Sequence, residues 1–112
     1  MTLNGSPFLR RVEIAQSFFH RSRGLLGRDA LPREHGLLIL PCCSIHTLGM
    51  RFAIDAIFLN REGDVVRVVR DVGAGRFLVA GGRGAHATLE LSAGWLPRDA
   101  VNAGDKITWT PV

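Results

Sequence analysis

The sequence predicts the α+β fold class: mostly antiparallel β structure in a small barrel-like sheet, with one or two short helices. Two observations lead to this prediction. Roughly six or seven short segments are either wholly apolar or alternate between apolar and polar residues, as strands do. Turn-forming residues, including 13 glycines and 5 prolines, separate these segments, and a single short stretch carries clear helix signals.

The first expected elements are a strand and a helix. Residues 8–14 alternate between apolar and polar positions, which predicts a half-buried strand. Ser17 belongs to the residue types that cap helix N-termini, and Gly24 can end a helix in the left-handed conformation. We therefore expect a helix of about two turns over residues 18–23.

The next segments are more apolar. After a surface loop at residues 27–35, the wholly apolar run 37–40 predicts a strand that is buried on both faces. Pro41 ends this strand because proline cannot donate a backbone hydrogen bond. Residues 42–52 should then form a structured loop, and the alternation of a strand returns at residues 53–59.

A hairpin is the strongest local prediction in the sequence. Residues 60–64 lie between the strand at 53–59 and a second β-rich run at 65–70, and Gly63 suits a position with positive φ. Later on, a strand is expected at 76–80 and another, cleanly alternating, at 87–91. Glycine-rich turns at 71–75 and 81–84, a turn or short helix at 93–101, a tight turn at 102–105 and a strand at 106–110 complete the chain.

Length and composition restrict the class of protein. The 112 residues fit one domain, residues 1–112, large enough to fold without disulfides or metal. The net charge of +4 comes from thirteen arginines with Lys106 as the single lysine, and the arginines are scattered, so we expect no nucleic-acid binding. Because no apolar run reaches the ~18 residues of a membrane span, we expect a soluble, cytoplasmic protein.

Reactive side chains concentrate in residues 44–55, between two apolar segments. His46 suits the role of general base or metal ligand because imidazole titrates near neutrality. Asp55 begins an apolar strand, where a buried carboxylate must be paired or hydrogen-bonded. Each has a structural alternative: His46 as a partly buried imidazole bonded to backbone or to Asp55, and Asp55 as a tie to Arg51, Arg23 or a loop amide.

The two adjacent cysteines have several possible roles. Cys42 and Cys43 make poor disulfide partners for each other, so reduced thiols are expected. A zinc site would need both thiols, His46 and a fourth ligand such as His35, His86 or Asp55, but the spacing matches no standard zinc motif. Copper binding through Met50 and a nucleophilic thiolate are further alternatives. We favour buried thiols, a core methionine, and neither metal nor cofactor.

The order of motifs along the chain resembles the domain-of-unknown-function family 192. The motifs, ordered over roughly residues 14–107, are Arg23-Gly24-Leu25-Leu26-Gly27-Arg28, Gly36-Leu37-Leu38, Ile45-His46-Thr47, Met50-Arg51-Phe52, Ile54-Asp55, Phe58-Leu59, Leu89-Glu90-Leu91, Gly94 and Gly104-Asp105. The chain departs from the pattern at Ala53, where proline is frequent, and at Leu26, where methionine is common. The resemblance implies a compact, mostly β, single domain of prokaryotic proteins with no established reaction or cofactor. It also places Glu90 in a motif, which favours its joining the central polar site.

These observations predict a binding or accessory module for an unknown protein or small-molecule partner. The candidate ligand-binding residues are His46, Met50, Arg51, Asp55 and Glu90. We also expect His46 and Asp55 to approach within hydrogen-bond or one-water range. Two alternatives stay open: a hydrolase that uses His46 with a carboxylate, and a Cys/His metal-binding protein.

Overall fold

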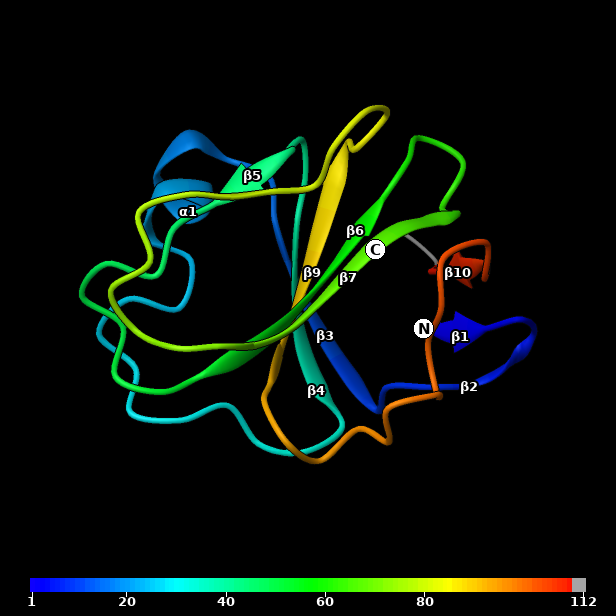
Figure 1. The fold of residues 1–112 in the computed structure, drawn as a ribbon, viewed down its shortest axis with the longest axis horizontal. Coiled ribbons are helices and arrows are strands. Elements are labelled where there is room, and N and C mark those ends of the chain that lie inside the picture. The colour runs from blue at the N-terminus through cyan, green and yellow to red at the C-terminus, as the bar shows by residue number, and fades with distance from the viewer. Residues whose placement is uncertain (110–112) are drawn as a thin grey trace.

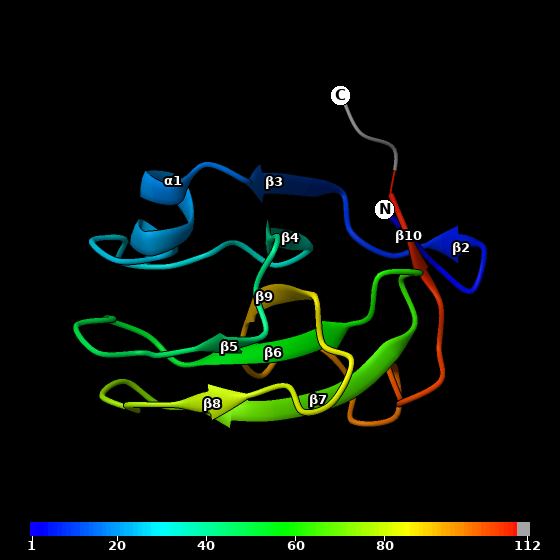
Figure 2. The same ribbon diagram turned by 90° about the horizontal axis from the view of Figure 1, so that it is seen from above.

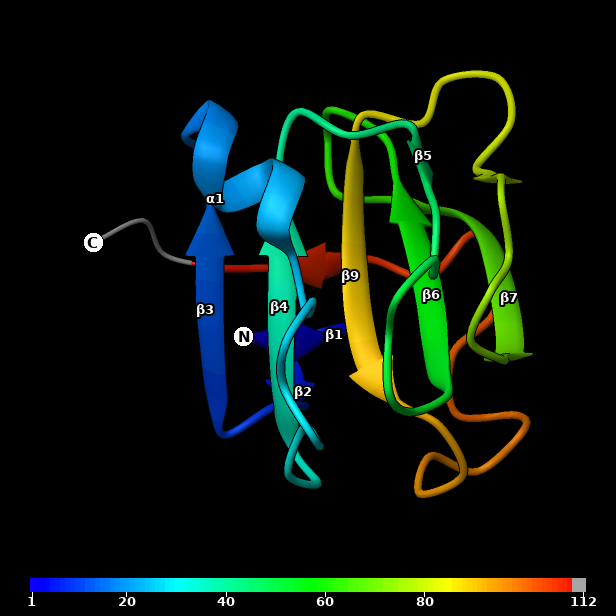
Figure 3. The ribbon, with the colours of Figure 1, turned by 90° about the vertical axis from the view of Figure 1, so that its left-hand side faces the viewer.

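A five-stranded sheet forms the centre of the molecule in the computed structural model, which describes residues 1–109. Figure 3 shows the strands side by side in the order β3-β4-β9-β6-β7. β3 runs parallel to β4, whereas every other neighbouring pair is antiparallel. The strands are β3 (Arg11–Ala15), β4 (His35–Ile39), β6 (Ile54–Leu59), β7 (Val65–Val72) and β9 (Ala87–Ser92).

Both faces of this sheet are buried. All six residues of β6 are buried, and successive side chains of a strand point to opposite faces. Ile54 and Phe58 therefore join one apolar cluster, while Ile57 joins a second cluster on the other face. The expected burial of residues 37–40 on both faces is confirmed for β4, because Leu37 and Leu38 are fully buried in different clusters.

The two clusters are covered by two outer layers. Figure 1 shows the central sheet edge-on, with α1 and β5 on one side and the sheet β10-β1-β2 on the other, and Figure 2 shows the same separation from above. β5 pairs with β8 in a further two-stranded sheet. The outer elements are α1 (Phe18–Arg23), β1 (Thr2–Leu3), β2 (Ser6–Pro7), β5 (Ser44–Ile45), β8 (Val79–Ala80) and β10 (Ile107–Thr108).

The predicted helix is confirmed together with both of its ends. The Ser17 hydroxyl accepts a hydrogen bond from the His20 amide at 3.1 Å, and Gly24 ends the helix at φ 49° while its amide donates to the His20 carbonyl. α1 has six residues, and no described helix is long and apolar enough to cross a bilayer. The hairpin is confirmed as well, with Gly63 at φ 89° between β6 and β7.

The predicted barrel is wrong in one respect, because the sheets do not close on themselves. β3 and β7 are the two edges of the central sheet, and the short strands pair separately. The strand expected at 76–80 is shortened to β8, and of the strand expected at 106–110 only Ile107–Thr108 is regular, while Thr110 lies outside the described residues. The glycine-rich stretch 81–84 is a turn, where a Cβ on Gly81 would collide with the Phe58 ring.

Candidate functional site

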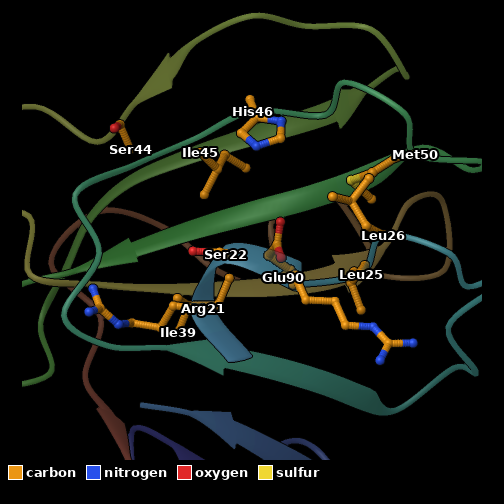
Figure 4. A pocket seen from close by; sticks show the side chains of 12 residues that line it. Arg21, Ser22, Leu25, Leu26, Ile39, Ser44, Ile45, His46, Met50 and Glu90 are labelled. Atoms are coloured by element: carbon orange, nitrogen blue, oxygen red, sulfur yellow. The ribbon is translucent and has the colours of Figure 1, made fainter. Parts of the chain in front are cut away.

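A pocket of about 280 Å³ lies between the C-terminal end of α1, β5 with the residues that follow it, and one face of the central sheet. Figure 4 shows the side chains around it. Its walls are mainly apolar, and polar groups stand at the rim and at the sheet. The lining residues are Arg21, Ser22, Arg23, Gly24, Leu25, Leu26, Ile39, Ser44, Ile45, His46, Met50 and Glu90.

Glu90 is the polar group that the central sheet presents to this pocket. It stands in the middle of β9 between Leu89 and Leu91, which join the cluster on the other face, so strand alternation places the Glu90 side chain on the pocket face. Its exposed fraction is only 3%. In Figure 4 its carboxyl group points into the pocket, toward the side on which His46 lies.

The carboxyl group of Glu90 has no partner among the residues that the structure describes. Within residues 1–109 no hydrogen bond or ion pair reaches it. Some buried side-chain atoms of the described residues are both sealed from solvent and without a hydrogen-bond partner, and Arg21 Nε is one of them. Neither oxygen of Glu90 belongs to this set, so both oxygens remain accessible from the pocket. Burial raises the pKa of Glu90 from 4.5 to about 7, because the charged form loses its hydration without gaining a partner.

Two other residues lie beside Glu90. One is Gly24 at the end of α1, where a Cβ would be in ordinary contact with Glu90 Oε1 at 3.7 Å and with the Arg21 carbonyl oxygen at 3.9 Å. Cys42 is another neighbour, and burial, with a smaller contribution from the charge of Glu90, raises the pKa of its thiol. Cys42 is therefore held as a thiol whose Sγ donates to the Ser44 carbonyl oxygen at 3.1 Å.

Three of the five candidate residues from the sequence meet at this pocket. His46 follows β5 directly and is exposed at the rim. Met50 is buried in the cluster on the same sheet face and forms part of the wall. Glu90 completes the group, buried on the pocket face of β9.

The other two candidates lie elsewhere. Arg51 is exposed and forms a surface ion pair with Asp29, Nη1 to Oδ1 at 2.7 Å. Asp55, in contrast, is 2% exposed, but it stands in β6 at the parity of Ile57, so its side chain is on the sheet face opposite to the pocket. Neither residue lines the pocket.

Asp55 serves a structural purpose in this arrangement. Its Oδ1 accepts a hydrogen bond of 2.8 Å from the Asp71 amide, at an irregularity in the β6–β7 pairing where Asp71 has φ 55°. Its Oδ2 lies 3.5 Å from Arg70 Nη1. The expected contact between His46 and Asp55 is not among the hydrogen bonds of residues 1–109, because both Asp55 oxygens face β7. The expected structural role is therefore correct in kind but not in its partners: the amide belongs to Asp71 in strand β7 and not to a loop, and the nearby cation is Arg70 in place of Arg51 or Arg23.

Thr47, whose structural role the sequence pattern does not indicate, fixes the loop beside the pocket. Thr47 is fully buried, and its Oγ1 donates to the Gly73 carbonyl oxygen at 2.7 Å and accepts from the Arg76 amide at 2.8 Å. Its backbone amide also donates to the Arg76 carbonyl oxygen at 2.9 Å. The loop that carries His46 and Met50 is thereby joined to the loop before β8.

The pocket also contains residues that sequence reasoning missed. Arg21 and Ser22 come from α1, and Leu25 from the turn after it, all far from the segment 44–55 in the chain. Arg21 Nη1 donates to the Pro41 carbonyl oxygen at 3.1 Å. The family motif around Gly24 and Leu25 was the available signal, since it shares its order with the His46 and Glu90 motifs.

Potential metal ligands do not gather in the part of the chain that the structure describes. No group of three His, Cys, Asp or Glu side chains there is arranged to hold a metal ion. Cys42 and Cys43 are both free, as expected from their adjacency; Cys42 is half-buried and Cys43 exposed.

Solved structures share this fold. A protein of unknown function from Novosphingobium aromaticivorans superposes with a TM-score of 0.79 at 22% identity, covering 88% of this chain and 74% of that one. A Sinorhizobium meliloti protein proposed to be a transcription regulator has a TM-score of 0.75 at 23% identity, covering 85% of this chain and 78% of that one. At these identities the likeness shows the fold alone.

Sequence relatives are more specific. A UPF0127 protein of Thermococcus sibiricus is 36% identical in an alignment of length 112 that covers 94% of this chain and 70% of that protein. A UPF0127 protein of Pyrococcus furiosus is 35% identical in an alignment of length 110 that covers 94% of this chain and 91% of that protein. The model of the family DUF192, described as Uncharacterized ACR, matches residues 1–109. The resemblance read from the motif order is thus confirmed, and the chain belongs to the DUF192 family.

Proposed function

We propose that this protein is a binding module whose pocket takes a small molecule with an apolar body and one polar group. The observation that carries the proposal is the Glu90 carboxyl group, which is buried, unpartnered within residues 1–109 and directed into the pocket. Buried polar groups in folded proteins are nearly always hydrogen-bonded. A pocket that leaves such a group open, with a shifted pKa, is typical of a functional site.

The walls of the pocket support an occupant that is small and largely apolar. Its volume of about 280 Å³ lies just below the usual range of small-molecule sites, roughly 300 to 1,000 Å³. Apolar contacts would come from both covering elements and from the sheet, through Leu25, Leu26, Ile39, Ile45 and Met50. Such walls favour a compact aliphatic or aromatic body over a strongly polar one.

Methyl-resolved NMR with a library of small soluble fragments tests this proposal. Binding fragments should shift the methyl signals of Leu25, Ile45 and Met50. The variant Ser22→Trp places a bulky ring at the exposed rim and should abolish those shifts, whereas Ser6→Trp, exposed in the outer layer on the other face of the central sheet, should preserve them. The proposal fails if no fragment produces shifts at these methyl groups, or if the shifts persist unchanged in Ser22→Trp.

A second candidate function is acid–base catalysis of a hydrolytic type. The observation in its favour is that Glu90 and His46 line the same pocket and that the pKa of Glu90, about 7, suits proton transfer at neutral pH. Hydrolysis of a panel of small esters, amides and glycosides, compared between the wild type and Glu90→Gln, tests it. Turnover that falls by about 100-fold or more in the variant would support catalysis. Turnover equal in both proteins, or absent from both, would contradict it.

A further inference from the structure

We propose that the ligand of this pocket carries a protonated amino group, which binds the carboxylate of Glu90 while its apolar body contacts the pocket walls. This inference rests on the proposed binding function and names the chemical class of the ligand. It follows from three features of the pocket: the acceptor oxygens beside Gly24, the lack of any cation paired with Glu90 within residues 1–109, and the apolar part of its walls.

Two hydrogen-bond acceptors border the pocket where α1 ends at Gly24. Glu90 supplies two carboxyl oxygens, and the end of α1 supplies the carbonyl of Arg21, which is adjacent to the position that a Gly24 side chain would occupy. Within residues 1–109 no hydrogen bond is donated to the Arg21 carbonyl oxygen, as is usual for the last turn of a helix. A ligand that satisfies these acceptors must therefore bring donors, and an ammonium group has three of them.

No protein cation neutralises Glu90 in the described structure. The charged or titratable groups that face it are Arg21 and Arg23 from α1, His46 after β5, and Cys42 after β4. None of them forms an ion pair or a hydrogen bond with the carboxyl group, and Arg21 is directed to the Pro41 carbonyl oxygen instead. Burial is accordingly the sole cause that raises the pKa of Glu90.

The charge of the ligand decides between an amine and a neutral donor. A hydroxyl group would donate one hydrogen bond and leave the negative charge of Glu90 buried without compensation. An ammonium group adds a charge-assisted hydrogen bond and removes that cost. The apolar wall formed by Leu26, Ile45 and Met50 excludes a second strongly polar group near the first, so a monoamine with an aliphatic or aromatic body fits best.

The affinity for an amine should depend on pH. A bound ammonium group favours the ionised form of Glu90, so affinity should rise as the pH increases through about 7 and fall about tenfold for each pH unit below it. His46 also lines the pocket, so its contribution has to be separated from that of Glu90. The variant His46→Gln therefore has to keep the same pH dependence, whereas Glu90→Gln has to lose it.

Three molecules of the same shape test the inference: 3-methylbutan-1-amine, 3-methylbutan-1-ol and 3-methylbutanoate, titrated at pH 8 and followed by methyl NMR and calorimetry. We expect the amine to bind at least about tenfold more tightly than the alcohol, and the carboxylate to bind most weakly. Glu90→Gln should weaken the amine about tenfold or more and leave the alcohol within about twofold. Glu62→Gln, an exposed carboxylate in the hairpin turn, is the matched control and should change neither.

The outcomes separate this inference from the proposed function. If the alcohol or the carboxylate binds as tightly as the amine, with shifts at Ile45 and Met50, the amine inference is wrong and the apolar pocket stands. If Glu90→Gln leaves amine affinity unchanged, the ligand class is likewise wrong. If none of the three molecules shifts these methyl groups at millimolar concentration, both the inference and the binding function are contradicted.

Discussion

Replacing Glu90 with glutamine should change how stability depends on pH, because the wild-type fold buries a carboxyl group that resists ionisation. The pKa of Glu90 is raised from 4.5 to about 7 by burial. A raised pKa means that the folded state binds the proton more tightly than the unfolded chain. The free energy of unfolding of the wild type therefore falls as the pH rises from 4.5 to about 7, and this penalty is constant above that range. Each pH unit corresponds to about 1.4 kcal/mol, so the full penalty is about 3 kcal/mol.

Urea melts of the wild type and of Glu90→Gln at pH 5 and pH 8 measure this effect. Glutamine has a similar shape and does not ionise, so the variant should gain roughly 2 to 3 kcal/mol relative to the wild type between the two pH values. The other titrating groups are common to both proteins and cancel in the comparison. Glu62→Gln, exposed in the hairpin turn, should show no such pH-dependent difference. A difference between the wild type and Glu90→Gln that stays constant within about 0.5 kcal/mol from pH 5 to pH 8 would refute the reasoning.

Three further predictions concern residues around the central sheet. Asp55→Ala should lower the free energy of unfolding in urea melts by about 3 to 5 kcal/mol, because Arg70 loses its buried counter-charge. Fragment binding in the refolded fraction should persist, and a loss of stability under about 1 kcal/mol would contradict the structural role. Thr47→Val should cost about 1 to 3 kcal/mol and speed hydrogen exchange of the Arg76 amide, and unchanged exchange would argue against the link between the loops. Leu89→Ala should lower the free energy of unfolding by about 2 to 5 kcal/mol, and His46→Ala by less than about 0.5 kcal/mol. Equal losses of stability in the two variants would make His46 a structural residue.

The sequence predicted best those elements that depend on local signals. Ser17 and Gly24 determine the ends of α1 through their own hydrogen-bonding and backbone preferences, and Gly63 does the same for the hairpin. The barrel expectation failed because closure depends on which strands pair at the edges. The parallel pairing of β3 with β4 and the separate pairing of β5 with β8 leave no local trace in the sequence.

The candidate site was predicted in part for a similar reason. His46 and Asp55 are close in the chain but are separated by the sheet, because β6 places Asp55 on the face opposite to the pocket. Glu90 is distant in the chain and yet shares the pocket with His46. Both β6 and β9 are buried on both faces, so no alternation of polarity indicates which face a given carboxyl group occupies. Only the paired register of β6 with β9 decides it.

The wall of the pocket formed by β5 has a dynamic consequence. This wall belongs to a two-stranded sheet of four residues, separate from the central sheet, and is fastened by Thr47 and by the burial of Ile45. Short elements with few hydrogen bonds open locally at lower free energy than the core strands of a domain. We therefore expect β5 to open by local unfolding while the five central strands remain paired. The residence time of a bound molecule would then follow the opening rate of β5, with no need for the whole chain to unfold.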